Sequence, residues 1–506
     1  MKRPLVWRLT AASRADFRRD KILGLIIELL PLRIVGRTTR WVLVALLLPI
    51  APLRGQQPPA VPPALAPFVS VSAPIVALTH VRVIDGTGAP ARMDQTVILD
   101  GARIGSVGPF ASTTIPAGAR VIDLSNHTVL PGLVGLHEHT YFGGVTRVTP
   151  MNVSGPLLYL AYGVTTAMTA GSMLPYHEVS LKRAVDENRT PGPRFLIAGP
   201  YLDGDASRNP MSLKVGTPDA ARRAVRYWSD EGATWIKFLG AETREVLRAA
   251  IEEAHARGLR VTGHLCSVTF TEAATLGIDL LQHGFITNTD YIPGKQPDIC
   301  PPGNQSVQAD VDVNTPQVQA TIDVIVRNRT AVVSTLAVYE SFIADHPLDS
   351  RVLDLLADDT RKEVESIHAG LAGAAFNVPP RLLQKMMIWE RAFVAAGGLL
   401  GAGVDPWGTG VLPGLGDLRN YELLVKAGFT PEQSTEIMTL NGARILGEEE
   451  RVGSITTGKR ADLVVVRGDP VATPAEIYNV VTVFKEGTGY DSAKLREAAR
   501  GRVGIN

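Results

Sequence analysis

The pattern of hydrophobic and polar positions changes twice along the chain. Residues 74–130 contain short apolar or alternating runs separated by Gly and Asp turns, which predicts β-strands. Residues 449–490 return to this pattern and are followed by a C-terminal tail, residues 491–506. We therefore expect the two ends of the chain to form one small β-sandwich domain that is discontinuous in sequence.

The central body, residues 131–448, alternates apolar runs of strand length with stretches in which apolar residues recur every three or four positions. Eight segments are expected to contain strands: TVLPGLVGLHEH, GVTTAMTA, PRFLIAGP, TWIKFL, LRVTGHL, DLLQHG, AVVSTL and LLGAGVDP. Between most of them the sequence predicts surface helices, such as TPDAARRAVRYWSDEG, which ends at a Gly. This alternation predicts an α/β fold, a (β/α)8 TIM barrel beside the β-sandwich domain.

Residues 1–73 follow neither pattern. Arginines precede an apolar run from Trp41 to Pro52, and a Pro-rich linker follows at residues 56–73. The apolar run is shorter than the roughly 20 residues of a spanning helix, so residues 1–55 are expected to be a signal peptide, with an uncleaved N-terminal anchor as the alternative. We therefore expect an exported protein, periplasmic or extracellular, that is membrane-anchored only if this segment is retained.

Length, charge and cysteine content narrow the class of protein. A chain of 506 residues suits a barrel of roughly 250 to 400 residues plus a smaller domain. Lys and Arg number 51 against 50 Asp and Glu, so the formal charge of +1 gives no reason to expect a nucleic-acid partner. The two cysteines, Cys266 and Cys300, exclude a disulfide scaffold and a thiolate zinc cluster. They can pair with each other in an exported protein or remain two free thiols.

Polar residues with metal-binding side chains lie at or just after the ends of predicted strands. They are His137, His139, Lys237, His264, His283 and Asp405. Because the carboxyl ends of barrel strands meet on one face, these side chains can converge on one point. His137 and His139 are two residues apart on one strand, so both imidazoles point to the same side and can reach one metal ion.

Each of these residues, taken singly, also has a structural explanation. Histidines at strand ends are often core or surface residues, and Lys237 alone can be a solvated lysine. His264 and His283, however, are 19 residues apart with a short helix between them, the spacing of neighbouring barrel positions. Asp405 follows the apolar segment GLLGAGV, where an unpaired carboxylate would lose its hydration, and a metal ion and a water molecule would satisfy it.

Several segments, in order along the chain, resemble one known family. They are PGLVGLHEH, GVTTAMTAG, GATWIKF, EEAHARGLRVTGHL, GIDLLQHG, GAGVDP and GSITTGKRADLVVVRGDP. They resemble the amidohydrolase superfamily, and more narrowly its imidazolonepropionase-like and Xaa-Pro dipeptidase-like metal-dependent hydrolases. The resemblance extends from about Ala73 to about Tyr490. One departure is Gly135, which stands where the family often has an aspartate two positions before the first histidine. This puts in doubt a contact to a ligand, not a ligand itself.

The resemblance implies two divalent metal ions, for which zinc is the simplest choice with a histidine-rich set. It implies that His137, His139 and Asp405 hold the more buried ion, that His264 and His283 hold the second, and that a carbamylated Lys237 bridges both. A free ammonium beside two cations would be repelled, so a lysine fits here only if it is neutral or modified. A metal-bridged hydroxide would then attack the substrate carbonyl, with Asp405 as general base and afterwards general acid.

We therefore expect an amidohydrolase that cleaves the amide or peptide C–N bond of a small molecule, such as a dipeptide or an N-acyl amino acid. A deaminase or cyclic-amide hydrolase of the same superfamily is the first alternative, although such enzymes usually have one metal ion and Lys237 disfavours that site. A non-catalytic barrel scaffold is the second alternative, and the presence of all six positions disfavours it. A homo-oligomer is compatible with this fold.

The segment from Thr287 to Pro316 is long for a loop after a barrel strand and is rich in Pro and Gly. We expect it to cover the active-site mouth. Within it, Tyr291 and Lys295 are candidates for binding a substrate carboxylate, and a solvated lid without substrate contact is the alternative.

Overall fold

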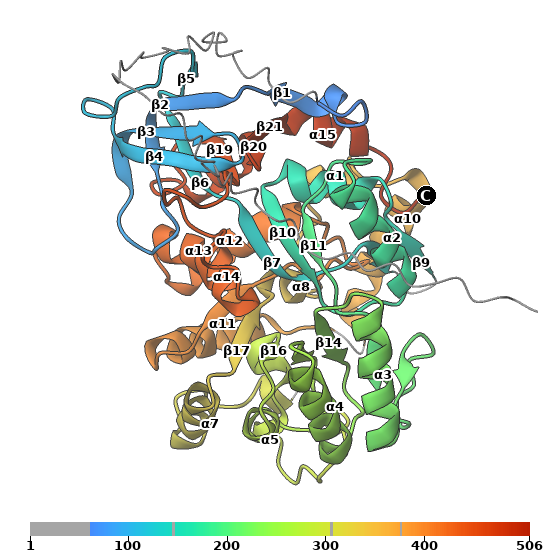
Figure 1. The fold of residues 1–506 in the computed structure, drawn as a ribbon. Helices are drawn as coiled ribbons and strands as arrows, with labels where there is room; N and C mark the ends of the chain where they lie inside the picture. The colour runs from blue at the N-terminus through green and yellow to red at the C-terminus, as the bar shows by residue number, and fades with distance from the viewer. Residues whose placement is uncertain (1–60, 144–146, 304–306, 375–376, 506) are drawn as a thin grey trace, which may run out of the picture. The chain divides into compact units, whose positions relative to one another are not determined.

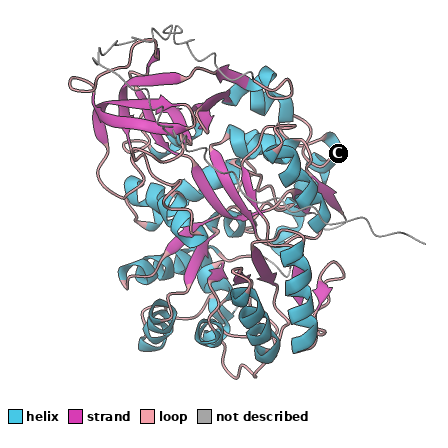
Figure 2. Cartoon of the chain, viewed as in Figure 1, coloured by secondary structure: helices cyan, strands magenta, loops and turns pink. Residues whose placement is uncertain are grey.

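The computed structural model describes residues 61–143, 147–303, 307–374 and 377–505. These residues form a mixed α/β fold (Figure 1), with strands and helices distributed as Figure 2 shows. The apolar run from Trp41 to Pro52, expected to be a signal peptide or anchor, lies outside the described residues. Within the described ranges, none of the helices is both long and apolar enough to cross a membrane.

Both ends of the described chain contribute to one antiparallel-rich sheet. Its strands are β1 (Val69–Val71), β2 (Ile75–Val83), β3 (Arg92–Asp100), β4 (Arg103–Pro109), β5 (Arg120–Asp123), β6 (His127–Pro131), β19 (Leu463–Arg467), β20 (Val480–Lys485) and β21 (Thr488–Asp491). Their order is β1-β21-β20-β19-β6-β2-β3-β4, with β5 paired to β2. The two ends meet where Leu130 of β6 pairs with Val464 of β19. We expected a sandwich of two sheets, whereas the strands hydrogen-bond in one continuous sheet of nine.

Two boundaries differ from the sequence-based expectation. The end of the Pro-rich linker is not a separate segment, because Val69 pairs with Tyr490 and so adds β1 to the sheet. The C-terminal tail is also structured: α15 (Ser492–Ala499) is anchored by the Ser492 hydroxyl, which donates to the Ala161 carbonyl at 2.6 Å. Leu495 of this helix is fully buried. Apolar side chains at these positions are stabilised by burial, which local sequence does not reveal.

The central body contains two parallel sheets. The first has the order β11-β10-β7, and the second β13-β12-β14-β15-β16-β17-β18. The strands are β7 (Leu133–Glu138), β10 (Val164–Thr169), β11 (Arg194–Leu196), β12 (Tyr201–Asp203), β13 (Leu213–Lys214), β14 (Trp235–Phe238), β15 (Arg260–Gly263), β16 (Leu280–Gln282), β17 (Ala331–Ser334) and β18 (Leu400–Ala402). A two-stranded ribbon of β8 (Tyr141–Gly143) and β9 (Val148–Pro150) lies apart from them. Each of the eight segments predicted to contain a strand does contain one.

Hydrogen bonds also join the two parallel sheets at two places. The amide of Thr234, just before β14, donates to the Ile197 carbonyl, just after β11, at 2.9 Å. At the second place the amide of Asp405, after β18, donates to the His137 carbonyl of β7 at 2.8 Å. Side chains from β7, β10, β14, β16 and β17 meet in one buried apolar cluster that includes Leu136 and Trp235.

Helices connect the parallel strands and pack around them (Figure 1). They are α1 (Ser154–Ala161), α2 (Pro175–Asp186), α3 (Pro218–Asp230), α4 (Arg244–Ala256), α5 (Phe270–Leu276), α7 (Pro316–Arg327), α8 (Leu336–Ser341), α9 (Ser350–Leu353), α10 (Asp358–Gly370), α11 (Pro380–Ala395), α12 (Leu415–Ala427), α13 (Pro431–Met438) and α14 (Leu440–Leu446). Local sequence fixes several helix starts. The Thr269 side chain, for example, accepts from the Glu272 amide, and the Glu272 carboxylate accepts from the Thr269 amide.

Candidate metal centre

The six residues singled out in the sequence come together at the carboxyl ends of five parallel strands. His137 and His139 lie at the end of β7, Lys237 on β14, His264 after β15, His283 after β16 and Asp405 after β18. All except His139 line one cavity of about 310 Å³. His139 is behind this wall, with its Nε2 atom 3.2 Å from Asp405 Oδ1. The structure thus brings the six predicted residues together in one place.

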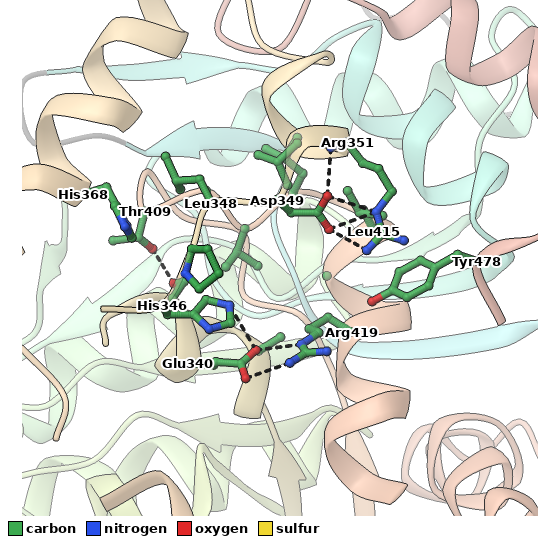
Figure 3. A pocket seen from close by; sticks show the side chains of 18 residues that line it. Glu340, His346, Leu348, Asp349, Arg351, His368, Thr409, Leu415, Arg419 and Tyr478 are labelled. Atoms are coloured by element: carbon green, nitrogen blue, oxygen red, sulfur yellow. Dashed lines mark hydrogen bonds and ion pairs between the residues drawn. The ribbon is translucent and has the colours of Figure 1, made fainter. Parts of the chain in front are cut away.

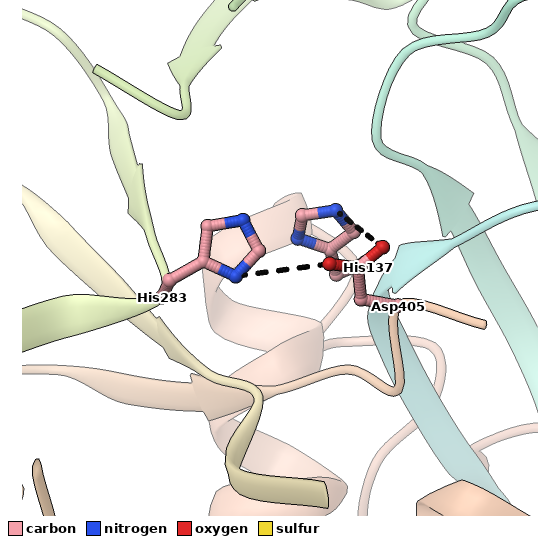
Figure 4. A group of neighbouring side chains, drawn as sticks. All are labelled: His137, His283 and Asp405. Atoms are coloured by element: carbon pink, nitrogen blue, oxygen red, sulfur yellow. Dashed lines mark ion pairs between the residues drawn. The ribbon is translucent and has the colours of Figure 1, made fainter. Parts of the chain in front are cut away.

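Asp405 is the centre of this group (Figure 4). Its Oδ1 atom is 3.5 Å from Nε2 of His137, and its Oδ2 atom is 3.9 Å from Nδ1 of His283. The backbone of Asp405 has a φ of 52°, and that of His283 a φ of 68°. Residues other than Gly rarely adopt this left-handed conformation, and such positions concentrate at functional sites. The hydrogen bond from the Asp405 amide to β7 helps to hold the conformation.

A neighbouring amide fixes the tautomer of His137. The Gln282 side chain donates through its nitrogen to Thr262 Oγ1 at 2.8 Å, which leaves its oxygen to accept from His137 Nδ1 at 2.7 Å. Nδ1 therefore carries the proton, and the lone pair of Nε2 faces Asp405. Metal-ligating histidines are usually oriented in this way by a hydrogen bond at the other ring nitrogen.

Burial also favours the neutral form of the ring nitrogens. It holds the pKa of His283 and of His137 well below the ordinary value, with the neighbouring cationic groups as smaller causes. Burial likewise lowers the pKa of His264 to about 4. Neutral imidazoles keep the lone pair that a metal ion requires.

Three buried polar atoms of the site have no hydrogen-bond partner among the described residues: Nζ of Lys237, Nδ1 of His139 and Nε2 of His283. Such atoms are rare in folded proteins and indicate a missing ligand or ion. Lys237 is completely buried, and this burial lowers its pKa to about 7. The donor set and its unsatisfied atoms fit metal ions, and a lysine with a neutral amine fits beside them.

The closest group of potential ligands does not follow the expected division into two sites. Donor atoms of His137, His283 and Asp405 all lie within 4.8 Å of one another. We expected His137 and Asp405 to share an ion with His139, and His283 to belong to the second ion. The structure brings the six residues together, but the ring of His283 is as close to His137, expected at the first ion, as to His264, expected at the second.

Aromatic residues that the sequence reading missed form much of the cavity wall. The hydroxyl of Tyr201, on β12, forms hydrogen bonds with His139 Nε2 at 3.2 Å and with the Tyr141 hydroxyl at 2.7 Å. Tyr339 of α8 packs edge-on against His283, with ring centroids 5.4 Å apart. Tyr201 follows directly after the predicted strand PRFLIAGP, so its position at a strand end was a usable signal.

The two candidates for substrate binding lie elsewhere. Tyr291 is buried in the core, and its hydroxyl accepts from Trp389 Nε1 at 3.2 Å. The Lys295 ammonium donates to the carbonyls of Ser267 and Gln296 at 2.6 and 2.7 Å. Neither lines the cavity, because the start of this segment folds into the short helices η2 (Gly284–Thr287) and η3 (Thr289–Tyr291) that pack on the core.

A disulfide ties the same segment to the residues that follow β15. Cys300 pairs with Cys266, two residues after His264, with a Cα–Cα distance of 4.9 Å. Of the two expectations for these cysteines, the structure has the paired one. Residues 298–302 therefore form a wall beside the metal centre, lining a second cavity.

A third cavity, of about 290 Å³, borders on α8 but does not contain the predicted ligands (Figure 3). Its charged residues already have partners. Arg419 contacts both carboxylate oxygens of Glu340, at 2.7 and 2.9 Å, and Arg351 contacts both of Asp349. We therefore place the functional site in the cavity of the six predicted residues.

Comparison with known proteins points to amidohydrolases. Residues 410–489 match the model of the Amidohydrolase family. An imidazolonepropionase of Pseudomonas aeruginosa (strain UCBPP-PA14) is 24% identical over 414 residues, which is 79% of this chain and 92% of that enzyme. A protein of Bifidobacterium longum assigned as a prolidase superposes with a TM-score of 0.61 at 25% identity, over 82% of this chain and 94% of that chain.

This chain is thus similar in sequence and in fold to members of the amidohydrolase superfamily. It is a hydrolase that acts on carbon–nitrogen bonds, so the alternative of a non-catalytic scaffold is wrong. A Xaa-Pro dipeptidase solved with methionine in its active site has the same fold, with a TM-score of 0.61 at 20% identity, over 82% of this chain and all (100%) of that chain.

Proposed function

We propose that this chain is a metal-dependent hydrolase of dipeptides or N-acyl amino acids, built on a (β/α)8 barrel. The observation that carries the proposal is the set of six potential ligands, five of which line one cavity. Three of the six have buried polar atoms with no hydrogen-bond partner among the described residues. The hydrogen bonds that join the two parallel sheets at two places, and the apolar cluster that their strands share, support a barrel wall.

We propose two divalent ions, most simply zinc, held by His137, His139, His264, His283 and Asp405, with Lys237 bridging them as a carbamate. The neutral amine that burial favours at Lys237 is the form that can react with carbon dioxide. When bound, the ions would supply acidification of a water molecule and polarisation of the scissile carbonyl.

The protein's own residues would move the proton. The Asp405 side chain is 19% exposed. It lies next to the histidines and also lines the cavity. It can accept a proton from the attacking water and deliver it to the leaving nitrogen, as general base and then general acid. The left-handed backbone of Asp405 holds its carboxylate in this position.

The cavity favours a small substrate with an apolar group. Its volume of about 310 Å³ suits a molecule of dipeptide size. Its wall contains Leu239, Val338, Phe342, Val378 and Trp407. Burial of an apolar side chain against this wall would contribute to binding.

We also propose export to an oxidising compartment, because disulfides persist mainly there and Cys266 and Cys300 are paired. The apolar run from Trp41 to Pro52 supports this proposal. Secretion of the chain from its native cells, measured by fractionation, would test it.

The function is tested with metal-loaded protein and a panel of dipeptides, N-acyl amino acids, cyclic amides and amino-heterocycles, together with metal analysis. We expect hydrolysis of a dipeptide or N-acyl amino acid and two metal ions per chain. Release of ammonia from an amino-heterocycle, or ring opening of a cyclic amide, without any dipeptide or N-acyl hydrolysis would replace this proposal by the deaminase or cyclic-amide alternative.

A further inference from the structure

A second cavity adjoins the metal centre and shares two lining residues with it. This cavity measures about 650 Å³, and both it and the metal cavity are lined by Leu239 and His264. The loop after β12 also borders both spaces, because Arg208 lines the second cavity and Asn209 lines the metal cavity. A substrate held at the metal centre can therefore extend past these residues toward Arg208.

Arg208 is the charged side chain of this second cavity that pairs with none of the described residues. It is exposed, and within the described part of the chain nothing forms a hydrogen bond or ion pair with its guanidinium. An unpaired guanidinium beside a binding cavity is well suited to a carboxylate, which it can bind through two parallel hydrogen bonds.

The two carboxylates of the same cavity are already satisfied. Asp203 is buried and accepts from the amides of Gly204, Gly240 and Ala241 at 3.0, 3.3 and 2.7 Å. Asp298 binds Arg244 through both oxygens, at 2.9 and 3.0 Å. Neither carboxylate is free to pair with Arg208 or with a cationic group of a ligand. The unbalanced charge of the cavity is therefore positive.

The loop that carries Arg208 is held on both sides of this residue. The Lys214 ammonium donates to the carbonyls of Ser207 and Asn209 at 2.9 and 3.1 Å. The Asn209 amide donates to Ser207 Oγ at 3.2 Å. Across the cavity, the disulfide between Cys266 and Cys300 fixes the opposite wall. The backbone is thus organised around a side chain that is itself free.

We propose that Arg208 binds a carboxylate on the amine half of the substrate, in the cavity that adjoins the metal centre. This inference rests on the proposed function, since it assumes that the scissile amide lies at the metal centre. It makes Arg208 a specificity-determining residue: substrates whose leaving amine carries a carboxylate are preferred over neutral amides and over amines with a cationic group.

The test measures binding without turnover. The probes are N-methanesulfonyl-L-leucine, a non-hydrolysable analogue of an N-acyl amino acid, and its carboxamide, each titrated calorimetrically into the metal-loaded full chain. We expect the wild type to bind the carboxylate probe at least roughly tenfold more tightly than the carboxamide, the gain of one charge-assisted pair. Arg208→Met should abolish this preference, and Arg208→Lys should keep part of it.

A matched control is Arg223→Met. Arg223 is also exposed, but it lies on α3 and lines a separate surface depression that shares no residue with the metal cavity. This variant should keep the wild-type preference. Because none of the described residues pairs with Arg208, circular dichroism should show that its substitution leaves the fold intact. A wild type that binds both probes equally or neither probe, or an Arg208→Met variant that keeps the preference, overturns the inference.

Failure of this inference is distinguishable from failure of the proposed function. If the panel shows dipeptide or N-acyl hydrolysis while Arg208→Met keeps the carboxylate preference, the inference about Arg208 alone is wrong. If no amide is hydrolysed but the carboxylate probe still depends on Arg208, the binding site stands and the proposed reaction falls.

Discussion

Lys237→Met should stabilise the metal-stripped protein and abolish its activity. The Lys237 side chain is completely buried, and its Nζ atom has no hydrogen-bond partner among the described residues. Methionine has a similar length and no charge, so it removes the cost of burying an ammonium group without leaving a large cavity. A buried lysine that lowers stability is understandable if the site needs its nitrogen.

The magnitude follows from the pKa of Lys237, which burial lowers from 10.5 to about 7. The unfolded chain keeps the proton up to about pH 10.5, and the folded chain only up to about pH 7. Stability of the wild type therefore rises with pH between these values. At pH 7 and below, the full cost of the buried ammonium is present, at most about 5 kcal/mol. By pH 10.5 the advantage of the methionine variant should vanish.

Urea denaturation of the metal-stripped proteins at pH 6.5 and at pH 10 measures this difference, while metal content and amide hydrolysis are measured on metal-loaded samples. Lys485→Met is the matched control. Lys485 of β20 is a partly buried lysine whose pKa desolvation lowers to about 8, and its ammonium donates to the Gly192 carbonyl at 2.8 Å. It should keep normal metal content and activity. A Lys237→Met protein that is no more stable than the wild type at pH 6.5, or that retains hydrolysis, would refute the reasoning.

Three further predictions concern other parts of the chain. Asp405→Asn should reduce turnover to background while metal content stays nearly normal; retained turnover would exclude Asp405 as the proton carrier. Replacing Cys266 and Cys300 together by Ser opens a link across 34 residues, which should lower the free energy of unfolding by about 4 kcal/mol by loop entropy; equal urea midpoints for the variant and the oxidised wild type would contradict this. Burial raises the pKa of Glu390 to about 8 from 4.5, so its ionisation costs stability above pH 8 and costs none below pH 4.5. Glu390→Gln should therefore be several kcal/mol more stable than the wild type at pH 8.5 and equal to it near pH 4.5; a difference that does not depend on pH would contradict the cause.

The convergence of the six candidate residues could be predicted because their positions depend on strand ends. His264 and His283 each follow an apolar run of strand length, and parallel strands bring their carboxyl ends to one edge whatever the connecting segments do. The residue types then limited the chemistry to metal binding. This part of the site is therefore encoded locally, in runs of about five residues that can be recognised without a structure.

The wall of the cavity could not be predicted in the same way. Tyr339 lies on α8, and its contact with His283 depends on how that helix packs after β17. Tyr291 failed as a candidate for a related reason. Its ring stacks on Phe285, which a turn brings back to it, and its hydroxyl accepts from Trp389, which is distant in sequence. Tertiary packing decides such positions, and local polarity does not report it.

Gly135 shows how a departure in sequence can be compensated by an irregularity in structure. A Cβ atom at Gly135 would lie 2.1 Å from Oε1 of Glu138, so the glutamate carboxyl fills the space of the missing side chain. Three residues apart on a regular strand, these two positions would point to opposite faces. In β7 the pairing with β10 shifts between Gly135 and Glu138, two residues opposing one, and this bulge returns Glu138 to the face of Gly135. There it accepts from the Val404 amide at 3.4 Å, next to Asp405. The space that Gly135 leaves is thus filled from the same strand, by a residue that the sequence places on the wrong side until the bulge is known.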